Sequence, residues 1–166
     1  MSRAGGEAGE AGAGGEAAEA GEGAGLRIPG RLRDLPSRLL GLAAARADRL
    51  VGAGLAGEGA RKWHYAVLVS LDEYGPTSQA GLSRRTGIYR SDLVAVINEL
   101  AERGHVEREP DPEDRRRNVV TLTTGGRAHL QRLDAVLAAA QDELTGSLSP
   151  SERALLASLL ERLLER

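Results

Sequence analysis

Side chains that can recognise a nucleic acid are concentrated on one face of an expected helix from Tyr89 to Arg103. Leucine, valine and isoleucine at helical spacing would bury the opposite face of this segment. The residues left exposed are Arg90, Ser91, Asp92, Val94, Ala95 and Asn98. Arginine can bond guanine edges or phosphate, asparagine can bond adenine or phosphate, aspartate can accept from cytosine, and valine can touch a thymine methyl group. This face therefore has the chemistry needed to read a DNA major groove.

A second group of cations is the triplet Arg115, Arg116 and Arg117, in the loop PDPEDRRR. The loop separates two short strand candidates, His105 to Glu109 and Asn118 to Leu122. Its prolines and acidic residues suit a hairpin turn. A guanidinium on a narrow hairpin tip fits the minor groove, where narrow A·T tracts concentrate negative potential. The alternative is a charged loop that meets only solvent.

The elements that would position these side chains follow from periodicity and capping signals. The expected helices lie at about Pro36 to Val51, Trp63 to Leu71, Thr77 or Ser78 to Gly87, Tyr89 to Arg103, Thr123 or Thr124 to Leu144, and Ser149 to Leu164. A short helix, a turn containing Gly87, a longer amphipathic helix and a hairpin with a basic tip form the order of a winged helix-turn-helix.

The segment from Gly104 to Leu130 carries a more specific signal. Its sequence GHVEREPDPEDRRRNVVTLTTGGRAHL resembles the signature of the MarR family of ligand-responsive bacterial regulators, Gly-x-Val-x-Arg, Asp-Pro, Asp-x-Arg, then Leu-Thr and Gly. The resemblance covers about Leu35 to Leu164. It implies an obligate dimer formed through the first and last two helices, with Arg116 inserted in the minor groove. The family often has threonine at the position of Asp92 and arginine at that of Ala95, so this chain departs from its relatives at both.

The predicted fold class is mainly α, a winged helix-turn-helix domain with long N- and C-terminal dimerisation helices and a two-stranded β-wing. The DNA-binding core is expected at about residues 60–123, between dimerisation helices at about 35–55 and 124–165. Residues 1–31 are rich in glycine, alanine and glutamate and are expected to form a disordered tail.

Charge and composition limit the function classes further. The formal net charge is −2, but residues 1–25 carry −4 and residues 26–63 carry +5, so any affinity for DNA must be local. The absence of cysteine excludes disulfides, thiolate zinc sites and regulation by thiol oxidation. No apolar stretch approaches the roughly 20 residues that span a bilayer, and a cytoplasmic protein is expected.

Two other function classes are alternatives to DNA binding. The motif from Gly52 to Gly57 matches the dinucleotide-binding Gly-x-Gly-x-x-Gly, and with His64 it could belong to a small enzyme. A strand must precede that motif, whereas here a helical pattern does. The chain is therefore expected to have no catalytic residues, metal or cofactor. A helical interaction module with solvated arginines is the third class.

An effector site is predicted near the start of the second helix. Trp63, His64 and Tyr65 cluster there, and with Arg46 and Arg49 they could hold an aromatic or carboxylate small molecule. Core packing is the competing explanation for the tryptophan and the tyrosine. His64 could instead sense protonation.

The terminal helix has more leucines than one small domain can cover. They are Leu155, Leu156, Leu159, Leu160, Leu163 and Leu164. A homodimer would bury them together with the stripe from Leu35 to Leu50. The sequence thus predicts a dimeric transcriptional regulator, expected to be a repressor, that binds double-stranded DNA at a pseudo-palindromic operator and is released by a small molecule.

Overall fold

The computed structural model describes residues 29–110 and 118–165. These residues form helices and three short strands. In chain order the elements are α1 (Gly30–Arg33), α2 (Pro36–Gly57), α3 (Lys62–Tyr74), β1 (Thr77–Ser78), α4 (Gln79–Thr86), α5 (Arg90–Glu102), β2 (Val106–Pro110), β3 (Asn118–Leu122), α6 (Thr124–Thr145) and α7 (Pro150–Leu164). The single turn of α1 includes Gly30 and Arg31, the last two residues of the expected tail.

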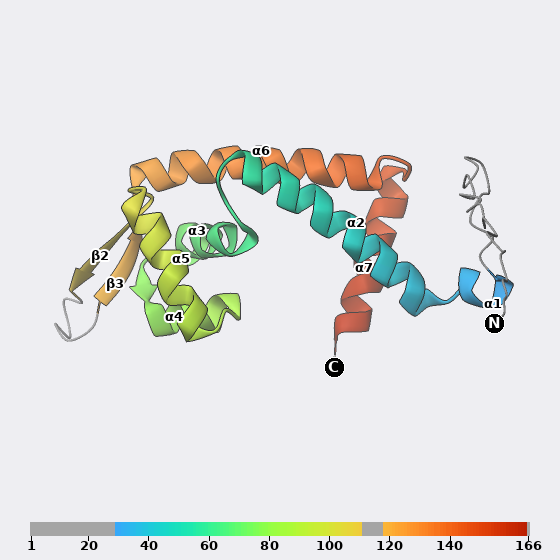
Figure 1. Ribbon diagram of the computed structural model, residues 1–166, viewed down its shortest axis with the longest axis horizontal. Coiled ribbons are helices and arrows are strands. Elements are labelled where there is room, and N and C mark those ends of the chain that lie inside the picture. Colours follow the sequence, from blue (N-terminus) through green and yellow to red (C-terminus); the bar gives the residue numbers. More distant parts are fainter. Residues whose placement is uncertain (1–28, 111–117, 166) are drawn as a thin grey trace, which may run out of the picture.

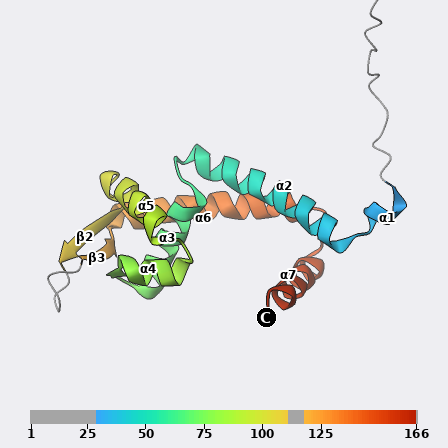
Figure 2. The same ribbon diagram turned by 60° about the horizontal axis from the view of Figure 1, so that its bottom comes forward.

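The long helices α2 and α6 lie side by side and form the span of an arch (Figures 1 and 2). The elements from α3 to β3 hang below one end of the span, and α7 hangs below the other. We call the first body, Lys62–Leu122, the winged lobe. The second region consists of α7 and the part of the chain from α1 to the middle of α2. We call this region the leucine arms.

The glycine-rich motif is part of α2, which runs without interruption to Gly57 and so passes the predicted end at Val51. At Gly54 an added Cβ would lie 2.6 Å from Cγ1 of Val136 in α6, so this glycine allows the two long helices to approach closely. Helix α2 itself precedes the motif, in place of a strand, and the motif is helical and not a phosphate-binding loop. The enzyme interpretation based on Gly52 to Gly57 therefore loses its structural basis.

The winged lobe has a continuous apolar core. Its fully buried side chains include Val67, Leu68, Leu82, Leu93, Ile97, Leu100, Val106 and Val120. Leu55 from α2 and Leu133 from α6 complete this core where the lobe joins the span. The predicted buried face of α5 is confirmed, since Leu93, Val96, Ile97 and Leu100 are all buried.

The wing is one strand larger than predicted. Its three antiparallel strands have the order β1-β3-β2, because Thr77 and Ser78 before α4 pair with Val120 and Val119 of β3. The predicted two-stranded wing is confirmed as β2 and β3, and only the additional strand β1 was not predicted, since two residues are too short to show strand periodicity. Pro110 was assigned to the loop but ends β2, where an edge strand tolerates proline.

Side-chain caps fix where the helices begin. The hydroxyl of Ser78 accepts a hydrogen bond from the Gly81 amide at 3.2 Å, and that of Thr123 accepts one from Gly126 at 2.9 Å. Both fall at expected positions. Gly126 also lies directly on the backbone, because an added Cβ would come 2.0 Å from the carbonyl oxygen of His105. This contact seats the start of α6 against the junction of α5 and β2.

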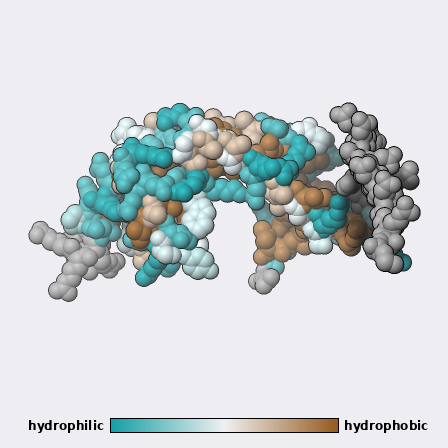
Figure 3. Space-filling model, in the orientation of Figure 1, coloured by the Kyte–Doolittle hydropathy of each residue, from teal (hydrophilic) through white to brown (hydrophobic). Residues whose placement is uncertain are grey.

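The leucine arms bury almost nothing within one chain. No residue of α7 is buried, and Leu159 and Leu163 are 45% and 66% exposed. Figure 3 shows apolar side chains gathered over the side of the arch where α7 lies. Among the helices of the described residues, none combines the length and apolar character required to cross a membrane.

Candidate nucleic-acid interface

The six α5 residues predicted to face DNA are all exposed, and they lie on two flanks of the helix. Arg90 and Val94 line one flank. Asp92 and Ala95 line the other. The periodicity of an α-helix explains this split, since residues four apart share a flank and residues two apart do not.

The first flank of α5 borders an open groove of about 560 Å³. The groove is formed by α4, α5 and the wing strands, and its lining residues are Ser78, Gln79, Ala80, Arg84, Arg90, Val94, Arg108, Asn118 and Val120. Three of them are arginines, each from a different element. Sequence reasoning missed Arg84 and Arg108, because only the fold brings α4 and β2 beside α5.

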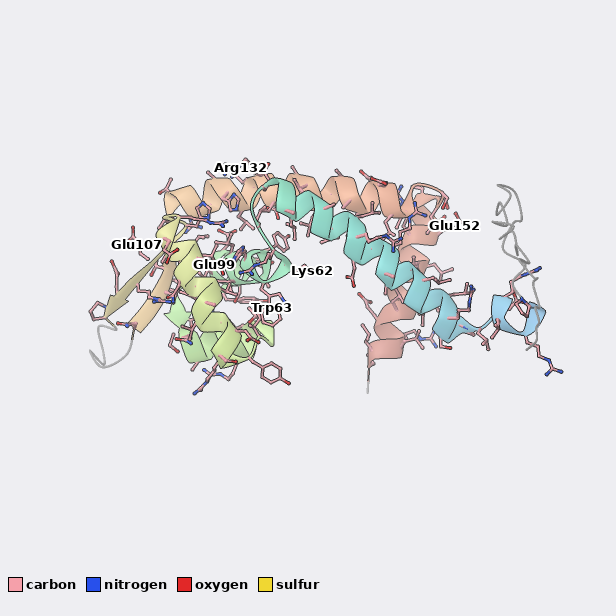
Figure 4. All side chains as sticks on the ribbon, viewed as in Figure 1. Lys62, Trp63, Glu99, Glu107, Arg132 and Glu152 are labelled. Carbon is pink, nitrogen blue, oxygen red and sulfur yellow. The ribbon has the colours of Figure 1, made fainter. Side chains whose placement is uncertain are left out.

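Arg108 joins the wing to α5, the helix predicted to read DNA. Its Nη2 donates to Oδ1 of Asn98 at 2.6 Å. Strand alternation puts Arg108 on the same side of β2 as buried Val106, while Glu107 projects from the outer side (Figure 4). Among the described residues, the amide donor of Asn98 has no partner, and its acceptor is shared with Arg108. A bidentate contact to adenine would use the second lone pair of this oxygen together with the amide donor.

A network of polar contacts ties the inner side of α5 to the chain between α2 and α3. Nη2 of Arg61 donates to both carboxylate oxygens of Glu99, at 2.6 and 2.5 Å, and Nε2 of His64 lies 3.0 Å from the same carboxylate. Arg103, at the end of α5, donates to the carbonyl of Gly59. The hydrogen bond from Arg61 lowers the pKa of Glu99 below its ordinary value, so this carboxylate stays charged.

His64 serves this network as a neutral ring. Its Nδ1 accepts from the backbone amide of Arg61 at 3.2 Å, which leaves the proton on Nε2, facing Glu99. Burial is the main cause that lowers the pKa of His64, and the charge of Arg61 acts in the same direction. Nδ1 thus helps to cap the start of α3, and Nε2 joins α3 to α5.

The residues predicted to hold an effector do not converge on one pocket. His64 is buried and turned to Glu99. Tyr65 donates to Asp134 of α6 at 2.9 Å, and burial together with this bond raises the pKa of Tyr65 to about 12. Arg46 and Arg49 are exposed on α2. Trp63 lines a separate hollow beside α5.

The arginine triplet lies outside the described residues, so Arg115, Arg116 and Arg117 stay predictions. The strands that flank them are placed, and Asn118, the residue that follows the triplet, lines the groove beside α5. Within the described ranges, no three histidine, aspartate or glutamate side chains are close enough together to hold a metal ion.

Comparison with known proteins gives consistent matches. A family model described as the MarR family matches residues 59–117. The transcriptional repressor NicR of Pseudomonas putida is 35% identical over 104 residues, 61% of this chain and 64% of the relative. A putative transcriptional regulatory protein for the hcr operon of Thauera aromatica is 32% identical over 106 residues, 64% of each chain. The matched region is thus somewhat less than two thirds of the length of these relatives.

Solved structures extend the similarity over the whole arch. A probable transcriptional regulator from Pseudomonas aeruginosa is 35% identical with a TM-score of 0.71, covering 80% of this chain and 99% of that one. A mutant MarR from E. coli complexed with operator DNA is 28% identical, with a TM-score of 0.68 and coverage of 78% and 93%. BpsR of Bordetella bronchiseptica, in a study of regulation of its DNA binding by 6-hydroxynicotinic acid, is 25% identical, with a TM-score of 0.71 and coverage of 84% and 99%. With its winged lobe, its long flanking helices and these matches, the chain belongs to the MarR family.

Proposed function

We propose that this chain is a sequence-specific, DNA-binding transcriptional regulator, a repressor, that acts as a homodimer and is released from its operator by a small molecule. The observation that carries the proposal is the groove beside α5, where arginines from α4, α5 and β2 border the exposed side of the reading helix. Such a face matches a helix in the major groove with cations reaching the phosphates on either side.

The charges of this face are available to a ligand. Within the described part of the chain, neither Arg84 nor Arg90 forms an ion pair, and Arg108 bonds the neutral amide of Asn98. A chain of net charge −2 cannot attract DNA through its overall field. Local arginines must therefore supply the attraction to phosphate.

The leucine arms support a homodimer. Their exposed leucines lie on α2 and α7, at the end of the arch away from the reading helix. A second copy that covers them would place two reading helices about a two-fold axis. The matching operator is a pseudo-palindrome with half-site centres roughly 10 base pairs apart. In this arrangement residues 60–123 bind DNA, and helices at about 35–55 and 124–165 form the dimer.

Repression and release follow from the relatives. NicR is named a repressor, and the DNA binding of BpsR is described as regulated by 6-hydroxynicotinic acid. By linkage, an effector that favours a wrongly spaced pair of reading helices must lower affinity for DNA, and DNA must weaken the effector equally. We also propose that the protein is cytoplasmic and has no catalytic activity.

The arginine triplet of the wing completes the proposed interface. Arg116 is assigned to the minor groove, where its contact is with shape and potential and not with one base. Arg116→Ala should therefore weaken specific and nonspecific duplexes alike and reduce the log-affinity against log-salt slope by about 1. Wild-type affinity and slope in this variant would mean that the triplet is a solvated loop.

A fluorescence anisotropy titration tests the proposed function as a whole. The protein is titrated into labelled duplex from upstream of its own gene, and into a shuffled duplex of equal length, at 50 and 200 mM salt. We expect tighter binding to the upstream duplex and, for six or more phosphate contacts, a loss of about 1,000-fold in affinity between the two salt concentrations. Equal binding to both duplexes, or none to either, would contradict the proposal.

A further inference from the structure

A hollow of about 320 Å³ lies on the second flank of α5. It is lined by Arg61, Trp63, Asp92, Ala95 and Val96, from the start of α3 and the first half of α5. Figure 4 shows Trp63 at the start of α3, beside α5. Trp63 is 39% exposed, whereas Val96 is almost fully buried. The hollow thus has an accessible indole and an apolar wall, and its volume fits a compact aromatic molecule.

The charges around the hollow favour a cation. Arg61 is neutralised by Glu99, which accepts two hydrogen bonds from its Nη2. Within the described ranges Asp92 has no ion-pair partner, and the hydroxyl of Ser91 donates a long hydrogen bond of 3.5 Å to its carboxylate. The remaining charge is therefore that of one exposed carboxylate beside an indole. An aromatic carboxylate, the effector class predicted from sequence, would meet repulsion from Asp92.

We propose that this hollow binds a small aromatic organic cation, with the ammonium group between the Trp63 ring and the Asp92 carboxylate. An indole face attracts a cation through its quadrupole, and does so more strongly than the other aromatic side chains. The carboxylate supplies the opposite charge, and Ala95 and Val96 contact the aromatic part of the ligand.

A ligand in this hollow would touch the reading helix itself. Asp92 and Ala95 belong to the exposed surface of α5, and Arg61 fixes the other side of this helix through Glu99. That the ligand would compete with or weaken DNA binding rests on the proposed function. The binding site itself does not, so the two can fail separately.

Trp63 is the only tryptophan in the chain, so its fluorescence reports on the hollow directly. The full-length protein is titrated with benzyltrimethylammonium and, as a probe of similar size and opposite charge, with benzoate. We expect a saturable change of Trp63 emission with the ammonium and none with benzoate. Asp92→Asn should weaken the ammonium about 5-fold, while Glu102→Gln, which removes a carboxylate elsewhere on α5, should change its affinity less than 2-fold.

Calorimetry with Trp63→Leu gives a readout independent of fluorescence, and we expect at least a 10-fold loss of ammonium affinity. Tighter binding of benzoate, unchanged affinity in Asp92→Asn, or no saturable signal with the ammonium would each overturn the site. A purely structural role of Asp92 at the start of α5 would lower the melting temperature without changing ligand affinity, and would also overturn it. Loss of DNA binding in the anisotropy titration, with ammonium binding intact, would instead reject the proposed function alone.

Discussion

The winged lobe and the leucine arms differ in the burial of their apolar residues. In the lobe, Leu68, Leu93, Ile97 and Leu100 are at most 1% exposed. In the arms, leucines spaced just as regularly stay on the surface, and Leu163 is 66% exposed. The lobe packs within one chain, because α3, α4, α5 and the sheet cover one another. Within the described residues, neither α7 nor the first half of α2 has a buried residue, so the leucines of the arms are left for another molecule to cover.

This difference in burial predicts that the two regions are stabilised in different ways. The lobe should depend on contacts within one chain, whereas the arms should depend on protein concentration, because their partner is a second copy. The ion pair of Arg61 with Glu99 and the hydrogen bond from Arg103 to the carbonyl of Gly59 join α5 to the segment that follows α2, away from the arms. Variants in each region should therefore affect different measurements.

The largest effect is expected in the arms. Leu159→Glu combined with Leu163→Glu puts two charges into the proposed dimer contact, and each lost leucine costs about 1.5–3 kcal/mol of apolar burial. We expect the dimer to weaken by at least 100-fold, or the chain to become insoluble. Light scattering at micromolar protein concentration measures the mass and so the fraction of dimer. Ser158→Glu, on the opposite side of α7 by helical periodicity, is the matched control and should stay dimeric. A wild-type protein with monomer mass would refute the dimer.

The next largest effect is expected on stability, where alanine substitutions at two neighbouring glycines at the edge of the lobe should differ. Gly126→Ala should lower the free energy of unfolding by about 3 kcal/mol, because its Cβ would meet the backbone carbonyl of His105. At Gly125 the nearest atom to an added Cβ lies 3.5 Å away. Gly125→Ala should therefore be neutral or stabilising by up to about 1 kcal/mol. Urea titrations compare the two, and equal stability would mean that the close approach of α6 to His105 carries no cost.

A third experiment tests whether DNA binding belongs to the lobe alone. Arg90→Ala should cost about 1–2 kcal/mol of operator affinity, because it removes one cation from the groove beside α5. Arg162→Ala removes the same charge from α7 and should leave affinity unchanged. Asn98→Ala should relax base preference and also release Arg108. Anisotropy titrations measure all three, and an equal loss in Arg90→Ala and Arg162→Ala would contradict the assignment.

The smallest expected effect is that of acidic pH on the free energy of unfolding. The three histidines of the chain are His64, His105 and His129, and burial lowers the pKa of each below the ordinary value of 6.5. The unfolded chain then binds more protons than the folded one just below pH 6.5, so the free energy of unfolding should fall as pH falls through that region. Urea midpoints of Trp63 fluorescence at pH 7.5 and 5.5 measure it. His105→Asn should reduce the difference, and a midpoint independent of pH would contradict this account.

Periodicity and capping signals in the sequence were sufficient to predict where most of the helices lie. Ser78, Thr123 and Ser149 cap the helices where expected, because a hydroxyl before an amphipathic run satisfies amides within its own turn. The end of α2 was misplaced, since glycines reduce helix propensity locally, whereas burial of Leu55 in the core and the close approach of Gly54 to Val136 stabilise that last part. Strand β1 was missed because its two residues are defined by their partners in β3.

For the candidate interface, the sequence by itself determined which side of α5 is exposed, because that depends only on helical spacing. The tertiary structure decided which distant residues join it. Arg84 and Arg108 come to Arg90 through the turn before α5 and the hairpin after it. The sequence grouped Trp63 with His64 and Tyr65, but consecutive residues of a helix point in different directions, and the fold supplies each with a different neighbour. Spacing along one helix is a local property, whereas contacts between helices depend on the packing of the whole lobe.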